Sequence, residues 1–267
     1  MQALILAAGE GSRLAAAGIP IPKPLVDVAG KPQILRLLQT FDALGCESLA
    51  CAIRADSPSV RRLLDAQRFR APFTVVECRT PSSLHTLVEG LRAVPPGPVC
   101  CSMVDTVMRA EDWRAVYGAV ERHLADGADA VLAVTGYVDD ESPVYVNRHE
   151  GGLVRAVSDE PIQPPCVTGG VYGLSAAARA AAAQALARGV YRMRGFLKAL
   201  LDGEVSIVVV AEFAREVVQP VTNAGQEGRL GLQAFDRVSV EPFERLHEVG
   251  DEGVNERVAL VVVAVWT

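Results

Sequence analysis

Short apolar stretches alternate with longer segments of helical period along the first half of the chain. The apolar stretches are rich in Val, Ile and Cys, and each has about the length of one strand. They predict five strands, at Ala3–Ala8, Ser48–Ile53, Phe73–Cys78, Pro98–Val104 and Asp129–Thr135. Strands that alternate with helices are typical of βαβ units, in which neighbouring strands run parallel. The pattern therefore predicts an α/β protein with a mostly parallel sheet flanked by helices.

The segment PQILRLLQTFDALG, residues 32–45, illustrates how one of these helices is specified. Proline is tolerated in a first helical turn, so Pro32 fits the start of the helix, and Gly45 supplies its end. Between them the apolar residues form a single stripe, which predicts that one face is buried. The stripe consists of Ile34, Leu35, Leu38, Phe41 and Leu44.

The rhythm changes after Gly136. Two extended runs in PVYVNRHEGGLVRAVS flank the turn at residues 149–152 and predict an inserted β-hairpin. The run VTGGVYGLS predicts a further strand before an alanine-rich helix, and the apolar run Val258–Trp266 predicts a buried last strand. Neither a linker nor a repeat is visible, so we expect one domain at residues 1–236. Residues 237–267 would be an extension that packs on this domain or forms a contact in a homo-oligomer.

Composition and charge narrow the class of partner. Half of the 267 residues are apolar, 22% are charged and the formal net charge is −6, which argues against nucleic acid. No basic segment precedes the first apolar run, and the last run is far shorter than the roughly 20 residues of a membrane-spanning helix. We therefore expect neither a signal peptide nor a membrane contact. The six cysteines lack paired spacing, which indicates buried, reduced thiols and a cytoplasmic protein.

The first predicted strand runs into the glycine turn LAAGEGSR, residues 6–13. Backbone N–H groups in such a turn are free to face an anion, and glycine allows a close approach. Because Leu14 stands where a dinucleotide fingerprint needs glycine, the glycines alone are weak evidence. Two cations strengthen the case, since Arg13 can fork onto phosphate oxygens and Lys23 lies between two prolines that stiffen the chain. A solvated surface loop is the alternative.

Asp105 directly follows the strand predicted at residues 98–104. Ligands bind at the carboxyl edge of open α/β sheets, and a single carboxylate there suits Mg²⁺, which takes one or two carboxylates together with substrate phosphates. An aspartate that caps a following helix is the alternative interpretation. The four histidines are scattered, so a zinc site is not predicted.

Three motifs in order resemble the nucleotidyltransferase family that joins an NTP to a sugar 1-phosphate or a related phosphate. They are the G-x-G-[ST]-R turn at residues 9–13, the P-K-P around Lys23, and the G-K-P at residues 30–32. TPSSLHTLVEGL, VTGGVYGLS and VTNAGQEGRLGLQAF resemble later family segments, so the resemblance covers residues 1–236. It implies a Rossmann-like (GT-A-like) fold with a mostly parallel, mixed sheet.

The resemblance implies a role for individual residues. Arg13, Lys23 and Asp105 would be catalytic, with Arg13 on the triphosphate and Lys23 neutralising the reacting phosphates. Asp105 and Asn223 would hold Mg²⁺, and Gly170 and Glu160 would lie at the acceptor. The nucleotide would contact Leu6, Ala7, Ala8, Gly9, Gly11, Ser12 and Ser83.

The chain departs from the family pattern at three places. Val104 stands where the family has glycine before the metal aspartate, and Ala224-Gly225 replaces Thr-Pro after Asn223. The family's E-K-P aligns with Asp159-Glu160-Pro161, so a glutamate stands where a lysine helps to bind the acceptor phosphate in many members. A carboxylate there would repel a phosphate. A different acceptor, another cation such as Arg155, or a loss of activity would account for this departure.

The sequence therefore predicts a Mg²⁺-dependent enzyme that transfers NMP from an NTP to a sugar 1-phosphate or a similar phosphorylated small molecule and releases pyrophosphate. A nucleotide-binding regulatory module without turnover is the alternative from another class. Phosphocholine cytidylyltransferase-like and molybdopterin guanylyltransferase-like enzymes stay open within the same family. A glycosyltransferase is less favoured because Asp105-Thr106-Val107 lacks the second aspartate of a D-x-D motif.

Overall fold

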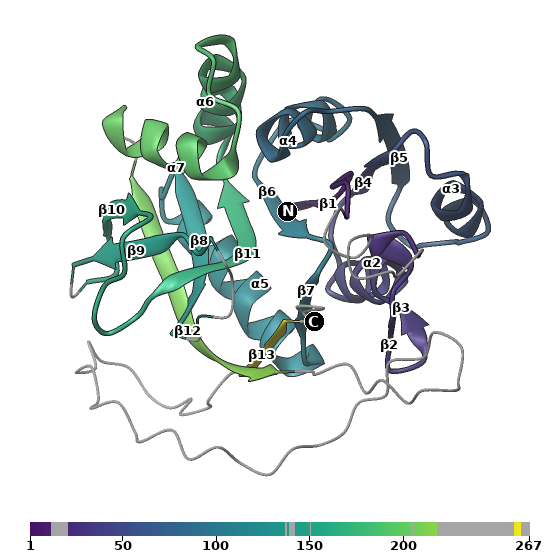
Figure 1. Ribbon diagram of the computed structural model, residues 1–267, viewed down its shortest axis with the longest axis horizontal. Helices are drawn as coiled ribbons and strands as arrows, with labels where there is room; N and C mark the ends of the chain where they lie inside the picture. The colour runs from purple at the N-terminus through teal and green to yellow at the C-terminus, as the bar shows by residue number, and fades with distance from the viewer. Residues whose placement is uncertain are drawn as a thin grey trace.

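The structure is a computed structural model that describes residues 1–11, 21–136, 138, 142–149, 151–203, 206–217 and 259–262 (Figure 1). The helices are η1 (Lys23–Leu25, a 3-10 turn), α2 (Gln33–Ala43), α3 (Pro58–Asp65), α4 (Ser83–Arg92), α5 (Ala110–Ala125), α6 (Ala176–Ala187) and α7 (Met193–Asp202). The strands are β1 (Gln2–Ala7), β2 (Asp27–Val28), β3 (Lys31–Pro32), β4 (Leu49–Arg54), β5 (Phe73–Cys78), β6 (Val99–Met103), β7 (Thr106–Met108), β8 (Ala130–Thr135), β9 (Tyr145–Arg148), β10 (Val154–Ser158), β11 (Val167–Leu174), β12 (Ile207–Val217) and β13 (Ala259–Val262).

The main sheet has the strand order β5-β4-β1-β6-β11-β8-β12-β13-β7. All five strands predicted from apolar runs are present, and β5, β4, β1 and β6 pair in parallel. The strand β8 does not lie beside β6, because β11 runs antiparallel between them and pairs with both. The sheet is therefore mixed and mostly parallel, as the sequence predicts.

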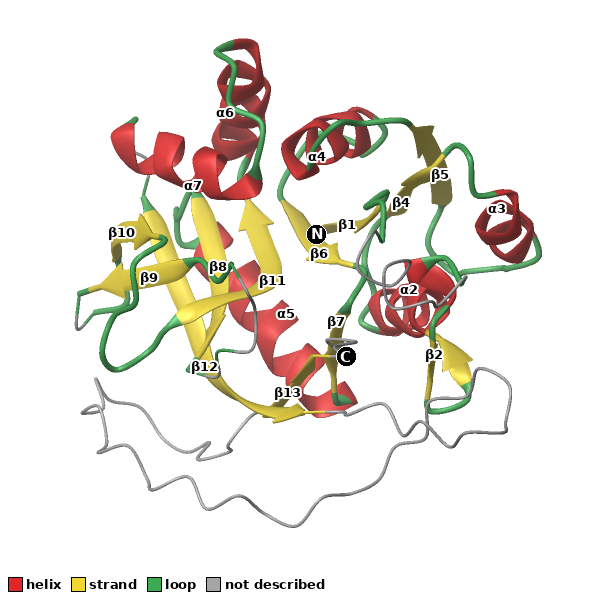
Figure 2. Cartoon of the chain, in the orientation of Figure 1, coloured by secondary structure: helices red, strands yellow, loops and turns green. Residues whose placement is uncertain are grey.

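Helices cover both faces of the sheet (Figure 2). Alternate residues of β1, β4 and β8 belong to opposite apolar layers. In β1, Ala3 and Ile5 pack with α2, α3 and α5, whereas Leu4 and Leu6 pack with α4, α6 and α7. Both faces of β1 are buried, which explains why its sequence is a continuous apolar run and does not alternate.

The predicted hairpin and the predicted helix at residues 32–45 are both present. The strands β9 and β10 pair antiparallel, and α2 is followed by Gly45 in the left-handed region at φ 79°. One detail of the prediction is wrong, because Pro32 does not lie in the first helical turn. It pairs with Asp27 in the β2–β3 hairpin, and its extended ψ of 131° precedes the helix. The helix begins at Gln33, whose amide donates to the Val26 carbonyl.

The strands β12 and β13 add to the sheet beyond the five strands predicted in the first half of the chain. The strand β12 pairs in parallel with β8, and β13 pairs with β12 and with β7. The domain boundary predicted after residue 236 lies outside the described residues and stays a prediction. Among the helices that the structure describes, none combines the length and the apolar character needed to cross a membrane.

The six cysteines are all free and buried. They lie at positions 46, 51, 78, 100, 101 and 166. Burial raises the pKa of the Cys46 thiol to about 11 and that of the Cys101 thiol to about 12. The thiols therefore pack as small apolar groups, as their positions in apolar runs predict.

The strand β11 passes unusually close to β7 at Gly170. This residue has φ 81°, and a Cβ built on it would lie 2.6 Å from the Thr106 Oγ1 atom. The Thr106 hydroxyl donates to the Gly169 carbonyl at 3.4 Å. Glycine at position 170 therefore allows β11 to contact the strand that begins directly after Asp105.

Arg179 of α6 ties this helix to the end of α4 and the loop that follows it. Its guanidinium donates four hydrogen bonds of 2.6–3.1 Å to backbone carbonyls, which belong to Leu91, Val94, Pro95 and Gly97. These carbonyls lie at a helix C-terminus, where the backbone has no further helical donors. Arg179 thus stabilises the α4–α6 contact on one face of the sheet.

We expect Arg179→Met to lower the free energy of unfolding by about 2–3 kcal/mol, because four carbonyls lose a charged donor. Urea denaturation measures this difference. Arg188→Met, at the exposed C-terminal end of the same helix, is the matched control and should change stability by less than about 0.5 kcal/mol. Equal losses in the two variants would contradict the assigned role of Arg179.

Gly170→Ala should lower the free energy of unfolding by about 2–4 kcal/mol, since the new Cβ overlaps with Thr106 and the backbone is left-handed. Gly151→Ala is the control, because no heavy atom lies within 4 Å of a Cβ at that position. Thermal and urea unfolding of both variants test this. A Gly170→Ala protein as stable as Gly151→Ala would show that the close approach of β11 and β7 is not required.

Candidate functional site

Three turns meet at the carboxyl edge of the parallel strands. The glycine turn follows β1, the turn at residues 55–57 follows β4, and Asp105 follows β6. Parallel pairing brings them together, because Ala7 lies beside Ile53 and Leu6 lies beside Met103. The amide of Val104 donates to the Leu6 carbonyl at 3.1 Å and holds the Asp105 turn against the end of β1.

An ion pair at this edge joins Lys23 to Asp105. The Lys23 Nζ atom lies 2.5 Å from the Asp105 Oδ2 atom, across 82 positions of sequence. The side chains are 35% and 28% exposed, so both charges are accessible to a ligand. Two residues that the sequence singles out are therefore side by side. The helix-cap interpretation of Asp105 is wrong, because strand β7 follows it and α5 begins only at Ala110.

Gln33 fixes the segment that carries Lys23. It is a buried amide, 3% exposed, whose Nε2 donates a short hydrogen bond to the Lys23 carbonyl. Its backbone amide donates to Val26 at 2.9 Å, so the first residue of α2 holds both ends of η1. Sequence reasoning missed this role, although glutamine directly after the G-K-P motif is a visible signal. Lys31 of that motif instead donates to Gln39 on the surface of α2.

The glycine turn leaves β1 at Ala8. Leu6, Ala7 and Ala8 are buried, whereas the next two residues, Gly9 and Glu10, are exposed. Gly11 has φ 62°, and a Cβ on it would lie 3.6 Å from the Lys23 Cβ. The turn and Lys23 are therefore neighbours, as a phosphate-binding arrangement requires.

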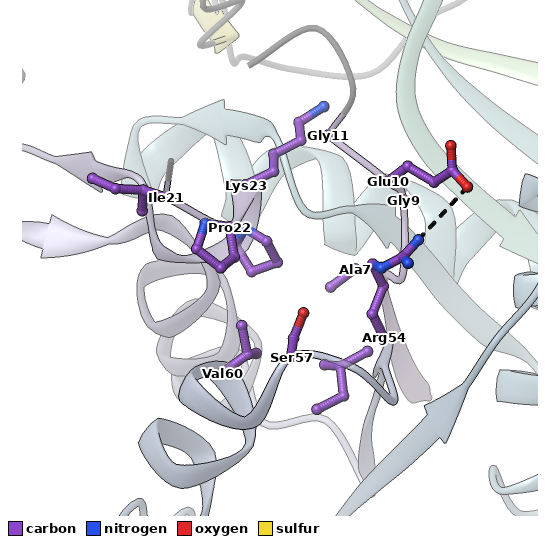
Figure 3. Close-up of a pocket in the computed structure, with 12 residues that line it drawn as sticks. Ala7, Gly9, Glu10, Gly11, Ile21, Pro22, Lys23, Arg54, Ser57 and Val60 are labelled. Atoms are coloured by element: carbon purple, nitrogen blue, oxygen red, sulfur yellow. Dashed lines mark ion pairs between the residues drawn. The ribbon is translucent and has the colours of Figure 1, made fainter. Parts of the chain in front are cut away.

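A cavity of about 210 Å³ lies between this turn and α3 (Figure 3). Its walls combine apolar side chains with a few polar groups, which is typical of small-molecule sites. Ser57 points its hydroxyl into the cavity from the N-terminus of α3 and does not cap that helix. The lining residues are Ala7, Gly9, Glu10, Gly11, Ile21, Pro22, Lys23, Pro24, Ile53, Arg54, Ser57 and Val60.

Arg54 brings a further cation to the cavity. Its Nε and Nη2 atoms donate to the Asp56 carboxylate at 2.8 and 2.6 Å, and its Nη1 atom lies 3.8 Å from Glu10 Oε1. The Arg54 fork, helped by Arg79, holds the pKa of the Asp56 carboxyl below its usual value. Sequence reasoning did not single out Arg54, because no phosphate motif contains it, but its position directly at a strand end was visible.

Ser83 lies near the same edge, with its side chain turned to a structural contact. Its hydroxyl accepts a 3.1 Å hydrogen bond from the Met193 amide at the start of α7. The neighbouring Ser82 contacts the Tyr191 carbonyl, and the His85 ring stacks on Tyr191 with ring centroids 5.6 Å apart. The N-terminus of α4 is thus bound to the α6–α7 loop.

The segment aligned with the acceptor lysine carries paired charges. Glu160 is exposed, and its amide donates to Ser158. Asp159 lies 2.6 Å from Arg194 and 3.6 Å from Lys198, both of α7. Among the described residues, the cations that pair with Asp159 therefore come from α7. The sequence suggested Arg155 instead, which is an exposed residue of β10.

Ser12, Arg13 and Asn223 lie outside the described residues, so their predicted roles stay predictions. Within the described part of the chain, no group of three or more His, Cys, Asp or Glu side chains is arranged to hold a metal ion. The structure thus brings Gly9, Gly11, Lys23 and Asp105 together at one edge. It adds Arg54 and Ser57 to them.

Comparison with known proteins finds curated relatives that are named as nucleotidyltransferases. Residues of this chain match the UTP–glucose-1-phosphate uridylyltransferase AglF of Haloferax volcanii at 26% identity over 167 residues, 62% of this chain and 67% of that protein. A mannose-1-phosphate guanylyltransferase 1 of Arabidopsis thaliana is 45% identical over 53 residues, 20% of this chain. The match spans only 15% of the length of the Arabidopsis protein.

Solved structures share the fold. The inositol-1-phosphate CTP transferase from T. maritima has a TM-score of 0.65 at 15% identity and covers 78% of this chain and 84% of that chain. A UDP-glucose pyrophosphorylase complexed with UDP-glucose has a TM-score of 0.62 at 15% identity, over 79% of this chain and 90% of that chain.

The sequence profile of the MobA-like NTP transferase domain matches residues 3–205, from the first strand to the end of α7. The matched range includes the glycine turn, Lys23 and Asp105, whose geometry is described above. The chain therefore belongs to the MobA-like NTP transferase domain family.

Proposed function

We propose that this protein transfers NMP from an NTP to a phosphorylated small-molecule acceptor and releases pyrophosphate. One observation carries the proposal: the ion pair between Lys23 and Asp105 lies beside the glycine turn at the carboxyl edge of β1 and β6. Family membership and relatives that act on sugar 1-phosphates support the same reaction.

The reaction makes and breaks one P–O bond. An oxygen of the acceptor's phosphate attacks the α-phosphorus of the NTP, and the bond from that phosphorus to the bridging oxygen breaks. Pyrophosphate leaves with the electron pair, so no covalent enzyme intermediate is required. Binding and charge stabilisation then supply the catalysis, because the reacting groups need only be held in line and their negative charge offset.

Backbone N–H groups of the turn after β1 would bind phosphate oxygens, with Gly9 and Gly11 allowing the close approach. Lys23 would leave Asp105 and place its ammonium on the reacting phosphates. This exchange is inexpensive, because a partly exposed ion pair stabilises a protein by only about 0–1 kcal/mol. Ser12 and Arg13, at the end of the turn, would complete the triphosphate site.

Asp105 fits the needs of Mg²⁺. It supplies a partly exposed carboxylate, a hard oxygen ligand, at the edge where the phosphates would lie. Asn223 is proposed as the other protein ligand. When bound, Mg²⁺ supplies positive charge to the phosphate oxygens. In the absence of ligand, the ion pair with Lys23 orients the Asp105 carboxylate at this edge.

The acceptor site would lie toward β10, β11 and α7. Gly170 would allow the acceptor's approach, and Arg194 and Lys198 would offset the missing lysine at position 160. Asp159 already orients both cations, so Glu160 need not face the acceptor phosphate. Sugar 1-phosphates are the acceptor class that the relatives support, with inositol phosphate and phosphocholine as neighbouring classes.

The direct test is pyrophosphate release with Mg²⁺ over a matrix of GTP, UTP, CTP, ATP and dTTP against hexose 1-phosphates, inositol 1-phosphate and phosphocholine. We expect release that needs one NTP and one acceptor together. Asp105→Asn and Lys23→Met should each lower kcat/KM by about 100-fold or more, since each removes charge at the reacting phosphates.

Asp126→Asn, an exposed aspartate at the end of α5, is the matched control and should leave the rate unchanged. NTP binding without pyrophosphate release anywhere in the matrix would favour the regulatory module instead. Release that persists in Asp105→Asn would contradict the assignment of this carboxylate.

A further inference from the structure

Glu10 places an acidic side chain inside the turn that is proposed to bind phosphate. It stands between Gly9 and Gly11, and its carboxylate is 77% exposed. A free carboxylate at this position would repel the triphosphate that the backbone N–H groups attract. The chain must therefore offset or redirect this charge if the turn is to serve the proposed reaction.

Arg54 is the cation that reaches Glu10. It is the last residue of β4, and β4 pairs with β1 up to Ala7, so its side chain begins next to the turn. The Arg54 Nη1 atom lies 3.8 Å from the Glu10 Oε1 atom, and Figure 3 shows the two side chains directed toward each other at the rim of the cavity.

Asp56 holds Arg54 in this position. Two hydrogen bonds of 2.8 and 2.6 Å form a fork between the guanidinium and the Asp56 carboxylate, two residues further along the chain. A fork of this kind fixes the plane of an arginine and leaves the third nitrogen, Nη1, in a set direction. The nitrogen that faces Glu10 is therefore oriented before any ligand binds.

The charges around the turn then balance. Arg54 faces Asp56 and Glu10, Arg79 acts on Asp56, and Lys23 faces Asp105. Of these groups, only Glu10 lies within the turn itself. If Glu10 had no cationic partner, its negative charge would offset the attraction of Lys23 for a phosphate ligand.

We infer that Arg54 is a positioning residue that holds the Glu10 carboxylate to the side of the glycine turn and neutralises it, so that a triphosphate meets the turn without a free negative charge. The inference rests on the proposed function of this site. It assigns Arg54 no bond to the ligand, and this separates it from a direct phosphate ligand such as the one proposed for Lys23.

A double-mutant cycle tests the inference, because the harm done by losing Arg54 depends on Glu10 being charged. Arg54→Met should raise the Kd of the nucleotide about tenfold and leave kcat within about twofold. Glu10→Gln should lower the Kd by about twofold. The double variant should return to within about twofold of Glu10→Gln.

The measurements are calorimetric titrations with the NTPs of the matrix and with tripolyphosphate, all with Mg²⁺. Tripolyphosphate lacks a base. If Arg54→Met raises the Kd of tripolyphosphate and of the NTP by the same factor, the lost interaction acts on the phosphates. The penalty of Arg54→Met should shrink as salt is raised, since salt screens the exposed Glu10 charge. Arg54→Lys should recover part of the lost affinity.

Arg61→Met is the matched control. Arg61 lies on α3 and also pairs with two carboxylates, Asp65 at 2.8 Å and Glu77 at 3.1 Å, but it does not line the cavity. This variant should bind both probes like the wild type. Unfolding measurements on all variants exclude a general loss of fold as the cause of weaker binding.

The outcomes separate the inference from the function on which it rests. If Glu10→Gln fails to restore binding to Arg54→Met, Arg54 contacts the phosphates itself or supports the fold, and the inference is overturned. If wild-type protein binds neither NTP nor tripolyphosphate, the proposed function fails with it.

Discussion

The ion pair between Lys23 and Asp105 connects the P-K-P segment to the end of β6. It joins residues 82 positions apart, and several separate features of the fold must be correct for it to form. The parallel pairing of β1 with β6 brings Asp105 to the end of β1. Gln33, at the start of α2, holds the short turn that carries Lys23. The contact can therefore form only when the P-K-P segment and the central sheet are in their native positions.

Ion pairs between a cation and a carboxylate recur in the candidate nucleotide and acceptor sites. Lys23 is held by Asp105, Arg54 by Asp56, and Arg194 by Asp159. Lys23 and Arg194 are oriented by their carboxylates while remaining partly exposed, so both can meet an anionic ligand without a large cost in desolvation. Arg54 instead turns its Nη1 atom toward Glu10. A site that is proposed to bind two phosphorylated substrates would benefit from cations that are already oriented.

Local sequence patterns predict the strands well, because a strand buried on both faces is a continuous apolar run, as in β1. They do not contain the strand order. The insertion of β11 between β6 and β8, and the return of β13 to β7, depend on long-range pairing. The same limit applies to the site. Motif order located Lys23 and Asp105, whereas the link from Arg54 to Glu10 and the bond from Ser83 to Met193 arise only when distant segments meet.

We propose that nucleotide binding separates Lys23 from Asp105, so that Lys23 binds the phosphates and Asp105 holds Mg²⁺. A crystal structure of the protein with Mg²⁺ and a non-hydrolysable NTP analogue tests it most directly. We expect the Lys23 ammonium to move from Asp105 to a phosphate oxygen, with the phosphates against the backbone of Gly9 and Gly11. A nucleotide bound elsewhere, with the 2.5 Å contact between Lys23 and Asp105 intact, would contradict it.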